Sequence, residues 1–518
     1  MANKSRTEYS MINIFVGFAG YFINTILGFV CRMVFVRCLS AEYLGISGLF
    51  SNVLSMLSLA EMGIGTAIVY ALYKPLAEHD EEKIASLMKF YGSAYRVIGC
   101  VVGVVGLVLL PFLRFIIGQT PDIKENIYLI YVVYLFNTCL TYFFSYRASL
   151  LMADQRNYIQ IGLSYFITII QSIVQMAVLY LTREYMFYLG IQTIGTIAFN
   201  IVVSWKTVHD YPYIERKDIK PLHADEKKSL FINVKALLTN NLACVLVNST
   251  DNIIITYFSG LITVGAASNY TLFSGTLSTL TNQIFNSLVA SVGNFNATNS
   301  EEGAFSFYKI LQLANFIIFG WASIGILFVT SDLVELCFGK QYVLSPSIPF
   351  VLALNFYLVT MQSAITTYRS TLGLFRYGQY TLIFTAVLNL AFSIALGNVW
   401  GLFGIYIATS FARMLTNTWY IPYAVFKYGF HRKPMEYFVI YARYLLIIVA
   451  DIGLCYLGCS WVRFSPAWNV LIKVIICSVV PNGMAYLMFR RTKELNYLKD
   501  KAKRIMGGST ILKKLHFK

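Results

Sequence analysis

Long apolar stretches separated by short polar breaks run along almost the whole chain of 518 residues. About fourteen of them reach the roughly 20 residues that a helix needs to cross the hydrocarbon core of a bilayer. We place them near residues 11–31, 43–72, 91–112, 126–150, 157–181, 185–205, 229–258, 262–294, 306–330, 347–368, 376–398, 400–424, 437–459 and 467–489. The pattern predicts an all-α polytopic membrane protein.

The longest interior polar segment follows the sixth apolar stretch and divides the chain. We therefore expect an N-terminal bundle of six helices at 1–205 and a cytoplasmic linker at 206–228. A second six-helix bundle, related to the first by pseudo-two-fold symmetry, would occupy 229–425. The remaining residues, 426–518, would form two extra transmembrane helices and a basic cytoplasmic tail.

Polar residues recur at helical spacing within several of these stretches. Serine, threonine, asparagine and glutamine at membrane depth often hydrogen-bond between helices, which is the usual explanation for any single polar stripe. Because such stripes occur on several helices, and unpaired polar groups facing lipid are costly, we favour a hydrated central cavity. The stripe residues that we expect to bind substrate there are Gln171, Gln175, Asn240, Asn282 and Arg369.

Two further arginines are candidates for binding a substrate. Arg413 lies near the middle of the twelfth stretch, too far from either surface for easy snorkelling, and shares a helix face with Ser410 and Asn417. A cation at this depth is costly, so it should face water, a carboxylate or an anionic ligand. Arg32, at the outer end of the first stretch, is the second candidate.

Two acidic residues lie on the polar stripes, Glu61 in the second stretch and Asp251 in the seventh. They would couple transport to a proton or a sodium ion, or they would balance the charge of an arginine such as Arg413. The sequence leaves both interpretations open.

The composition leaves few residues for a soluble domain, with 57% hydrophobic and 13% charged residues and a mean hydropathy of +0.62. The net charge of +16 would suit nucleic acid, but the placement of the charges argues against that partner. We count about 29 Lys and Arg on alternate loops and both termini against about 7 on the opposite loops, as the positive-inside rule expects. Both termini should therefore be cytoplasmic. The basic tail would suit anionic lipid headgroups, although membrane topology and solubility are the simpler explanation for its charge.

No combination of side chains suggests catalysis. All five histidines fall in predicted cytoplasmic loops or the tail, without acidic or cysteine partners at ligand spacing. The nine cysteines lack paired metal-ligand spacing, and the chain has no Walker motif for ATP hydrolysis. We therefore expect no enzyme, no metal site and no cofactor apart from a coupling ion.

Two segments of the sequence resemble a known family. The letters VRCLSAEYLG at 36–45 and LSLAEMGIGTA at 57–67 resemble the opening helices of Wzx-type polysaccharide flippases, which share a superfamily with MATE exporters and the lipid II flippase. NSTDNIII at 248–255 is similar to the start of that family's second half. The chain departs from the family at Cys38-Leu39-Ser40, where Leu-Gly often follows the arginine.

The resemblance implies a bacterial cell-membrane flippase for an oligosaccharide linked to undecaprenyl pyrophosphate. Such a protein moves its substrate from the cytoplasmic to the outer leaflet by alternating access, for the assembly of capsule, exopolysaccharide or O-antigen. Arg413 and Arg32 would hold the diphosphate, and the partners would be the lipid-linked oligosaccharide, membrane lipids and other polysaccharide assembly proteins.

Two other functions stay open. A MATE-like, ion-coupled exporter of small cations would need acidic residues to dominate the cavity. A membrane polysaccharide polymerase or ligase would need a large outer loop, whereas the predicted outer loops are short.

Overall fold

The computed structural model describes helices throughout, and no strand occurs among the residues it describes. These residues are 6–58, 65, 69, 71–76, 78–117, 122–154, 156–216, 218–222, 250–280, 282, 285, 292, 296, 300–374, 377, 378 and 380–507, with side chains described between 20 and 501 except at 116. Their contacts divide the chain into two compact units, Met1–Gly265 (unit 1) and Ala266–Lys518 (unit 2). The predicted all-α fold is confirmed.

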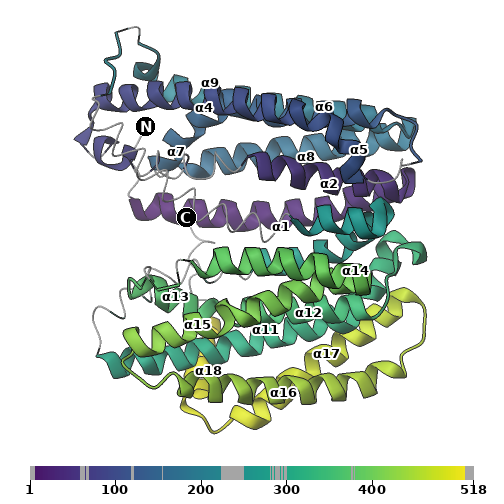
Figure 1. Cartoon of the computed structure of the whole chain (residues 1–518). Coiled ribbons are helices and arrows are strands. Elements are labelled where there is room, and N and C mark those ends of the chain that lie inside the picture. The colour runs from purple at the N-terminus through teal and green to yellow at the C-terminus, as the bar shows by residue number, and fades with distance from the viewer. Residues whose placement is uncertain are drawn as a thin grey trace. The chain divides into compact units, whose positions relative to one another are not determined.

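Unit 1 is built on long helices (Figure 1), and glycines allow some of them to approach closely. α1 packs on α8 and α8 on α9, while α4 and α9 both pack on α6. A Cβ added to Gly20 of α1 would lie 1.9 Å from the Tyr165 ring of α8, so only glycine allows this approach. The helices are α1 (Arg6–Cys38), α2 (Ala41–Leu57), α4 (Glu81–Leu109), α5 (Leu113–Ile117), α6 (Ile127–Phe144), α7 (Ala148–Ala153), α8 (Asn157–Thr182) and α9 (Tyr185–Asp210).

Unit 2 is arranged around its longest continuous helix, α11, which packs on α12 and α17. Phe316 of α11 and Tyr444 of α16 stack in its apolar core with ring centroids 4.4 Å apart. The helices are α11 (Glu301–Phe338), α12 (Ser347–Thr360), α13 (Ser363–Thr371), α14 (Thr381–Leu415), α15 (Asn417–Ala424), α16 (Met435–Ser460), α17 (Pro466–Phe489) and α18 (Lys493–Gly507).

Eleven helical runs in the described residues are long and apolar enough to cross a membrane, against about fourteen expected. One of them, Thr381–Gly429, contains two of the predicted stretches. The chain turns between them at Gly401, whose φ of 56° and ψ of −135° lie in a region that favours glycine. The predicted stretches at 43–72, 229–258 and 262–294 fall partly outside the described residues. The chain is a multi-pass membrane protein.

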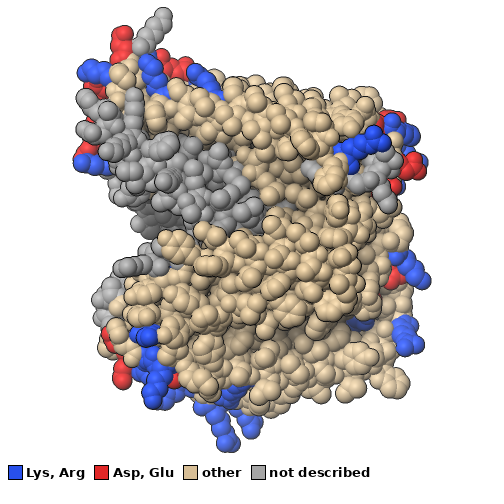
Figure 2. Space-filling view, in the orientation of Figure 1, with Lys and Arg blue, Asp and Glu red and all other residues tan. Residues whose placement is uncertain are grey.

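The sides of the helices carry the apolar surface that a lipid environment requires. Large apolar side chains are exposed along them, including Leu181, Ile194, Val399 and Leu446 at 66–80%. On the face that Figure 2 shows, the charged residues of each unit lie toward the ends of its helices and leave the sides between them uncharged. This distribution is typical of a membrane-embedded protein, because charge is costly in the hydrocarbon core.

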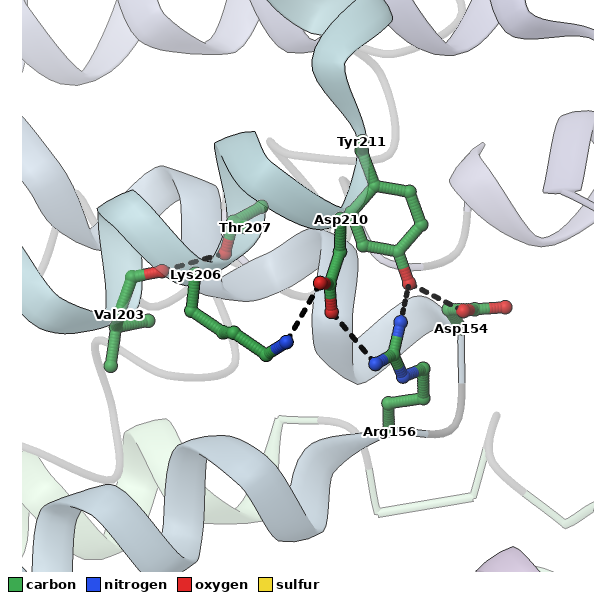
Figure 3. A network of polar contacts seen from close by, with 7 residues as sticks. All are labelled: Asp154, Arg156, Val203, Lys206, Thr207, Asp210 and Tyr211. Atoms are coloured by element: carbon green, nitrogen blue, oxygen red, sulfur yellow. Dashed lines mark hydrogen bonds and ion pairs between the residues drawn. The ribbon is translucent and has the colours of Figure 1, made fainter. Parts of the chain in front are cut away.

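A polar network fixes the end of α9 to the turn between α7 and α8 (Figure 3). Asp210 accepts hydrogen bonds from Lys206 and Arg156, each at 2.7 Å. The Tyr211 hydroxyl donates to Asp154, and burial together with this carboxylate raises the pKa of Tyr211. The hydroxyl therefore stays protonated and available as a donor.

The segment after α9 is also fixed to the start of α4. Arg216 pairs with Glu81 at 3.0 Å and Lys220 with Glu82 at 2.7 Å. These contacts hold the first part of the predicted linker against unit 1. α9 itself continues to Asp210, five residues beyond the predicted end of the first bundle, and residues 223–228 of the predicted linker lie outside the described part.

Candidate functional site

Two helices of unit 2 are interrupted near the middle of their spans, and residues beside both breaks line one cavity. Met361 and Gln362 separate α12 from α13 within the candidate span Ser347–Thr371. Thr416, with φ −122° and ψ −91°, separates α14 from α15. The Thr416 hydroxyl donates to the Ala412 carbonyl at 2.6 Å, a side-chain bond of the kind that bends helices.

The cavity between these elements has a volume of about 320 Å³, and its described lining consists of ten polar and five apolar residues. Irregular backbone at membrane depth is tolerated where it is buried in protein or lines a water-filled cavity, which fits the two breaks. The polar lining residues are Asn282, Gln362, Ser363, Thr366, Thr367, Arg369, Ser370, Arg413, Asn417 and Thr418. The apolar ones are Phe285, Leu358, Val359, Leu382 and Ile421.

The charges of the lining are all positive. Arg369 comes from α13 and Arg413 from the last turn of α14, and no Asp or Glu lies among the described residues that line the cavity. The Arg369 Nε donates to the Leu374 carbonyl at 3.4 Å, a contact that orients its guanidinium. The cavity therefore presents two cations together with amides and hydroxyls.

Two lining atoms have hydrogen-bonding capacity that the described protein does not use. The Asn417 Oδ1 and the Thr418 hydroxyl are buried and have no hydrogen-bond partner among the described residues. Buried polar atoms in native structures are paired with protein groups or water, so these two are suited to hydrogen-bond a polar ligand or water. Both residues open α15, directly after the break at Thr416.

Other polar residues of these helices hold the helices together and do not line the cavity. Ser410 is fully buried and donates to Asn355 of α12 at 2.8 Å, and Asn355 donates to the Tyr406 carbonyl at 2.9 Å. Asn389 donates to Thr409 at 2.8 Å across the turn at Gly401. Interhelical hydrogen bonding thus explains part of the polar pattern, as expected for single stripes.

Three of the predicted substrate residues, Arg413, Arg369 and Asn282, meet in this cavity. Gln171 and Gln175 lie in unit 1 on α8, where Gln175 is buried and donates to the Tyr188 carbonyl of α9 at 3.2 Å. Such a contact is typical of helix packing, and their role in substrate binding stays a prediction.

The remaining candidates lie in unit 1 or outside the described residues. Arg32 is partly buried on α1 and lies close enough to Tyr188 of α9 for an electrostatic interaction. Asp251 is partly buried near the start of the helical run Thr250–Leu280. Glu61 and Asn240 lie outside the described residues.

Sequence reasoning missed several lining residues on α13 and α15. Ser363, Thr367 and Ser370 of α13 line the cavity, as does Thr418 of α15. The signal was a run at 366–371 that is polar except for Tyr368, at the end of an apolar stretch, which is unusual for a helix that only packs on its neighbours. Polar residues at helical spacing identify one face of a helix, so polar residues on its other faces are not recognised.

Unit 1 contains a tyrosine cluster that the sequence did not reveal. The hydroxyls of Tyr134 and Tyr185 lie 3.0 Å apart, and Tyr134 donates to Ser47 at 2.9 Å. The Tyr185 ring lies near Phe35 and Tyr188 with centroids 5.9 and 6.1 Å away. Tyrosines of α6 and α9 meet Phe35 of α1 and Ser47 of α2 here, which no local sequence pattern predicts.

No protein-family model matches the chain, and no curated protein does. Solved structures do match it. The lipid II flippase MurJ, in an inward closed conformation, has a TM-score of 0.64 and 14% identity over 91% of this chain and 98% of MurJ. The chain has the fold of this flippase.

Transporters of the MATE family share the fold. An inward-facing MATE multidrug resistance transporter of the MOP superfamily has a TM-score of 0.62 and 14% identity over 78% of this chain and 95% of its own. A MATE protein in complex with MaD3S has a TM-score of 0.52 and 13% identity over 80% and 94%. At this identity the likeness concerns the fold, so the substrate has to be argued from the cavity.

Proposed function

We propose that this chain is a flippase that moves an oligosaccharide linked to undecaprenyl pyrophosphate from the cytoplasmic to the outer leaflet. The observation that carries the proposal is the cavity of unit 2, which Arg369 and Arg413 line without an acidic residue among its described lining. A guanidinium presents a fork of donors that matches phosphate oxygens, so two arginines suit a diphosphate. The amides and hydroxyls around them suit sugar hydroxyls.

The size of the cavity fits the head of such a substrate. Ligand sites usually enclose about 300–1,000 Å³, and the cavity, at about 320 Å³, lies at the lower limit. The diphosphate and the first sugar would occupy it, while the isoprenoid chain would stay in the bilayer. Because the two helix breaks lie near the middle of their spans, the site would serve alternating access about the midplane.

The alternatives are less well supported by the same lining. A MATE-like exporter of small cations needs acidic side chains, whereas the described lining supplies arginines. A polysaccharide polymerase or ligase is an enzyme, and the structures with this fold are those of transporters and flippases. The proposal includes that Asp251 or Glu61 couples transport to the movement of a proton or a sodium ion.

The proposal extends to the cellular location of the chain and to the pathway that it serves. We place the chain in the bacterial cell membrane with both termini in the cytoplasm, following the loop charges. Its product would feed the assembly of capsule, exopolysaccharide or O-antigen, in contact with other assembly proteins. The likeness of fold to the lipid II flippase MurJ supports a lipid-linked substrate.

The test replaces Arg413 and Arg369 by alanine in a strain whose surface polysaccharide depends on this chain. Charged hydrogen bonds contribute about 1.5–3 kcal/mol, so each variant should lower surface polymer about tenfold or more at unchanged protein level. The control is Arg463→Ala, since Arg463 is exposed between α16 and α17 and does not line the cavity.

Arg413→Lys separates charge from geometry, because lysine keeps the charge but loses the fork. It should retain part of the transport. Undiminished polymer in the Arg413→Ala, Arg369→Ala double variant would refute the proposed role of the cavity.

A further inference from the structure

A second pocket of unit 2 lies between α11, α16, α17 and α18 and shares no lining residue with the cavity described above. It has a volume of about 180 Å³. Lys309, Gln312, Arg443, Thr492 and Glu494 provide its polar groups. Its apolar wall consists of Leu313, Ile440, Tyr444 and Phe489.

Cations and a free amide donor converge on this pocket. Arg443 is exposed, lies over the Phe489 ring with 5.0 Å to the centroid and has no ion pair with the described acidic residues. Lys309 is 3.7 Å from Glu494, the one acid among the described lining residues. The charges of Lys309, Arg443 and Glu494 leave the lining with one net positive charge.

Gln312 is the observation that points to a ligand. Its side chain is 1% exposed, and its Oε1 accepts a hydrogen bond from Tyr308 at 3.2 Å. Its Nε2 has no hydrogen-bond partner among the described residues. Leaving a buried amide donor unsatisfied costs about 1–3 kcal/mol, so an acceptor in the pocket would remove a penalty that the unliganded protein bears.

The pocket lies toward one end of the candidate spanning helices α11, α16 and α17. Lys309 and Arg443 are each about two turns from the start of α11 and α16, whereas Phe489 ends α17 and Glu494 lies in the first turn of α18. The exposed neighbours on α16 and α17 are apolar, and they include Leu445, Leu446, Leu487 and Met488. Apolar side chains of this kind suit acyl chains, so a lipid is the anion carrier that this surface favours.

α18 borders the pocket through Glu494 and carries a further cation, Lys499, against the end of α17. It packs on α11, and its Leu495 is buried in the core of unit 2. Lys499 of α18 lies over the Tyr486 ring with 4.3 Å to the centroid. On the face that Figure 2 shows, Lys and Arg side chains gather at the end of unit 2 where α16 begins. Basic pockets between transmembrane helices bind anionic headgroups in this way.

We propose that the pocket binds the phosphate of an anionic phospholipid, with Lys309, Arg443 and the Gln312 amide as donors and the acyl chains along the exposed apolar sides of α16 and α17. The site is separate from the proposed substrate cavity. The proposal of a lipid site therefore does not depend on which substrate that cavity carries. Its occupation would fix α18 and the two C-terminal transmembrane helices to α11.

The experiment follows thermal unfolding of the purified full-length protein in detergent during titration with dioleoyl phosphatidylglycerol, dioleoyl phosphatidylcholine or inorganic phosphate. Phosphatidylglycerol should raise the unfolding temperature at lower concentration than the other two. Lys309→Ala and Arg443→Ala should each raise the half-saturating concentration of phosphatidylglycerol about tenfold, the loss of one charged contact. Gln312→Leu should weaken binding, and it should also lower the unfolding temperature in phosphatidylcholine because it removes the acceptor of the buried Tyr308 hydroxyl.

Lys433→Ala is the matched control, because Lys433 is exposed just before α16 and does not line the pocket. Should Arg443→Ala not fold, Arg443→Gln removes the charge and keeps most of the side chain. An unchanged phosphatidylglycerol titration in the Lys309→Ala, Arg443→Ala double variant would overturn the site. Equal stabilisation by phosphatidylcholine would overturn its selectivity for anions, and equal stabilisation by inorganic phosphate would overturn the assignment to a lipid.

Discussion

A buried ion pair between α11 and α17 offers a direct test of how the C-terminal helices are held. The Lys473 Nζ lies 2.6 Å from Asp332 Oδ2, and the two side chains keep 18% and 11% of their surface exposed. Asn469 also donates to Asp332, at 3.3 Å. Removing one partner leaves the other charge buried, which costs about 3–5 kcal/mol when burial is complete.

Because both side chains keep some exposure, we expect Asp332→Asn and Lys473→Met each to lower the free energy of unfolding by about 3 kcal/mol, the lower end of that range. The double variant should recover most of the loss, since no charge is then left unpaired. The assay is thermal or denaturant unfolding of the four proteins in one detergent. If the double variant loses the sum of the two single losses, the pair does not couple and the reasoning is wrong.

Three further changes test other parts of the structure. Gly401→Ala places a side chain at φ 56° and ψ −135° and should lower the free energy of unfolding by about 1–3 kcal/mol. The control is Gly453→Ala, on an exposed face of α16 with open space around it, which should be neutral or stabilising in the same thermal unfolding experiment. Asp210→Asn leaves Lys206 and Arg156 without their shared carboxylate, and trypsin should then cleave the segment after α9 faster. Gln175→Leu should lower the unfolding temperature and leave transport per folded molecule unchanged if Gln175 only packs α8 on α9.

The fold could be predicted because its signals are local. A run of about 20 apolar residues identifies a spanning helix without knowledge of its neighbours. The run at 376–424 was likewise predicted as two spanning stretches from its apolar residues alone. In the structure the chain turns at Gly401, where the second stretch begins. The helix breaks at Gln362 and Thr416 were not predicted, because each depends on hydrogen bonds and packing that an apolar stretch does not reveal.

The candidate site could be predicted in part. Arg413, Arg369 and Asn282 stood out as polar residues inside apolar stretches, and the structure brings them to one cavity. Gln175 stood out for the same reason but hydrogen-bonds to α9 within unit 1. Periodicity gives the face of a helix on which a residue lies, whereas the element facing it is decided by tertiary packing.

Lys473 and Arg413 show that two charges of the same sequence signal can lie in different surroundings. Both lie inside apolar stretches, and a charge at such depth requires a partner or water. Lys473 is neutralised by Asp332, which lies 141 residues away in the sequence, so packing alone accounts for it. Arg413 lines the cavity of unit 2 together with Arg369, and no Asp or Glu is among the described lining residues. In the proposed function, the oxygens of a diphosphate would accept hydrogen bonds from both guanidinium groups, so the proposal depends on an anionic ligand and fails if the cavity binds none.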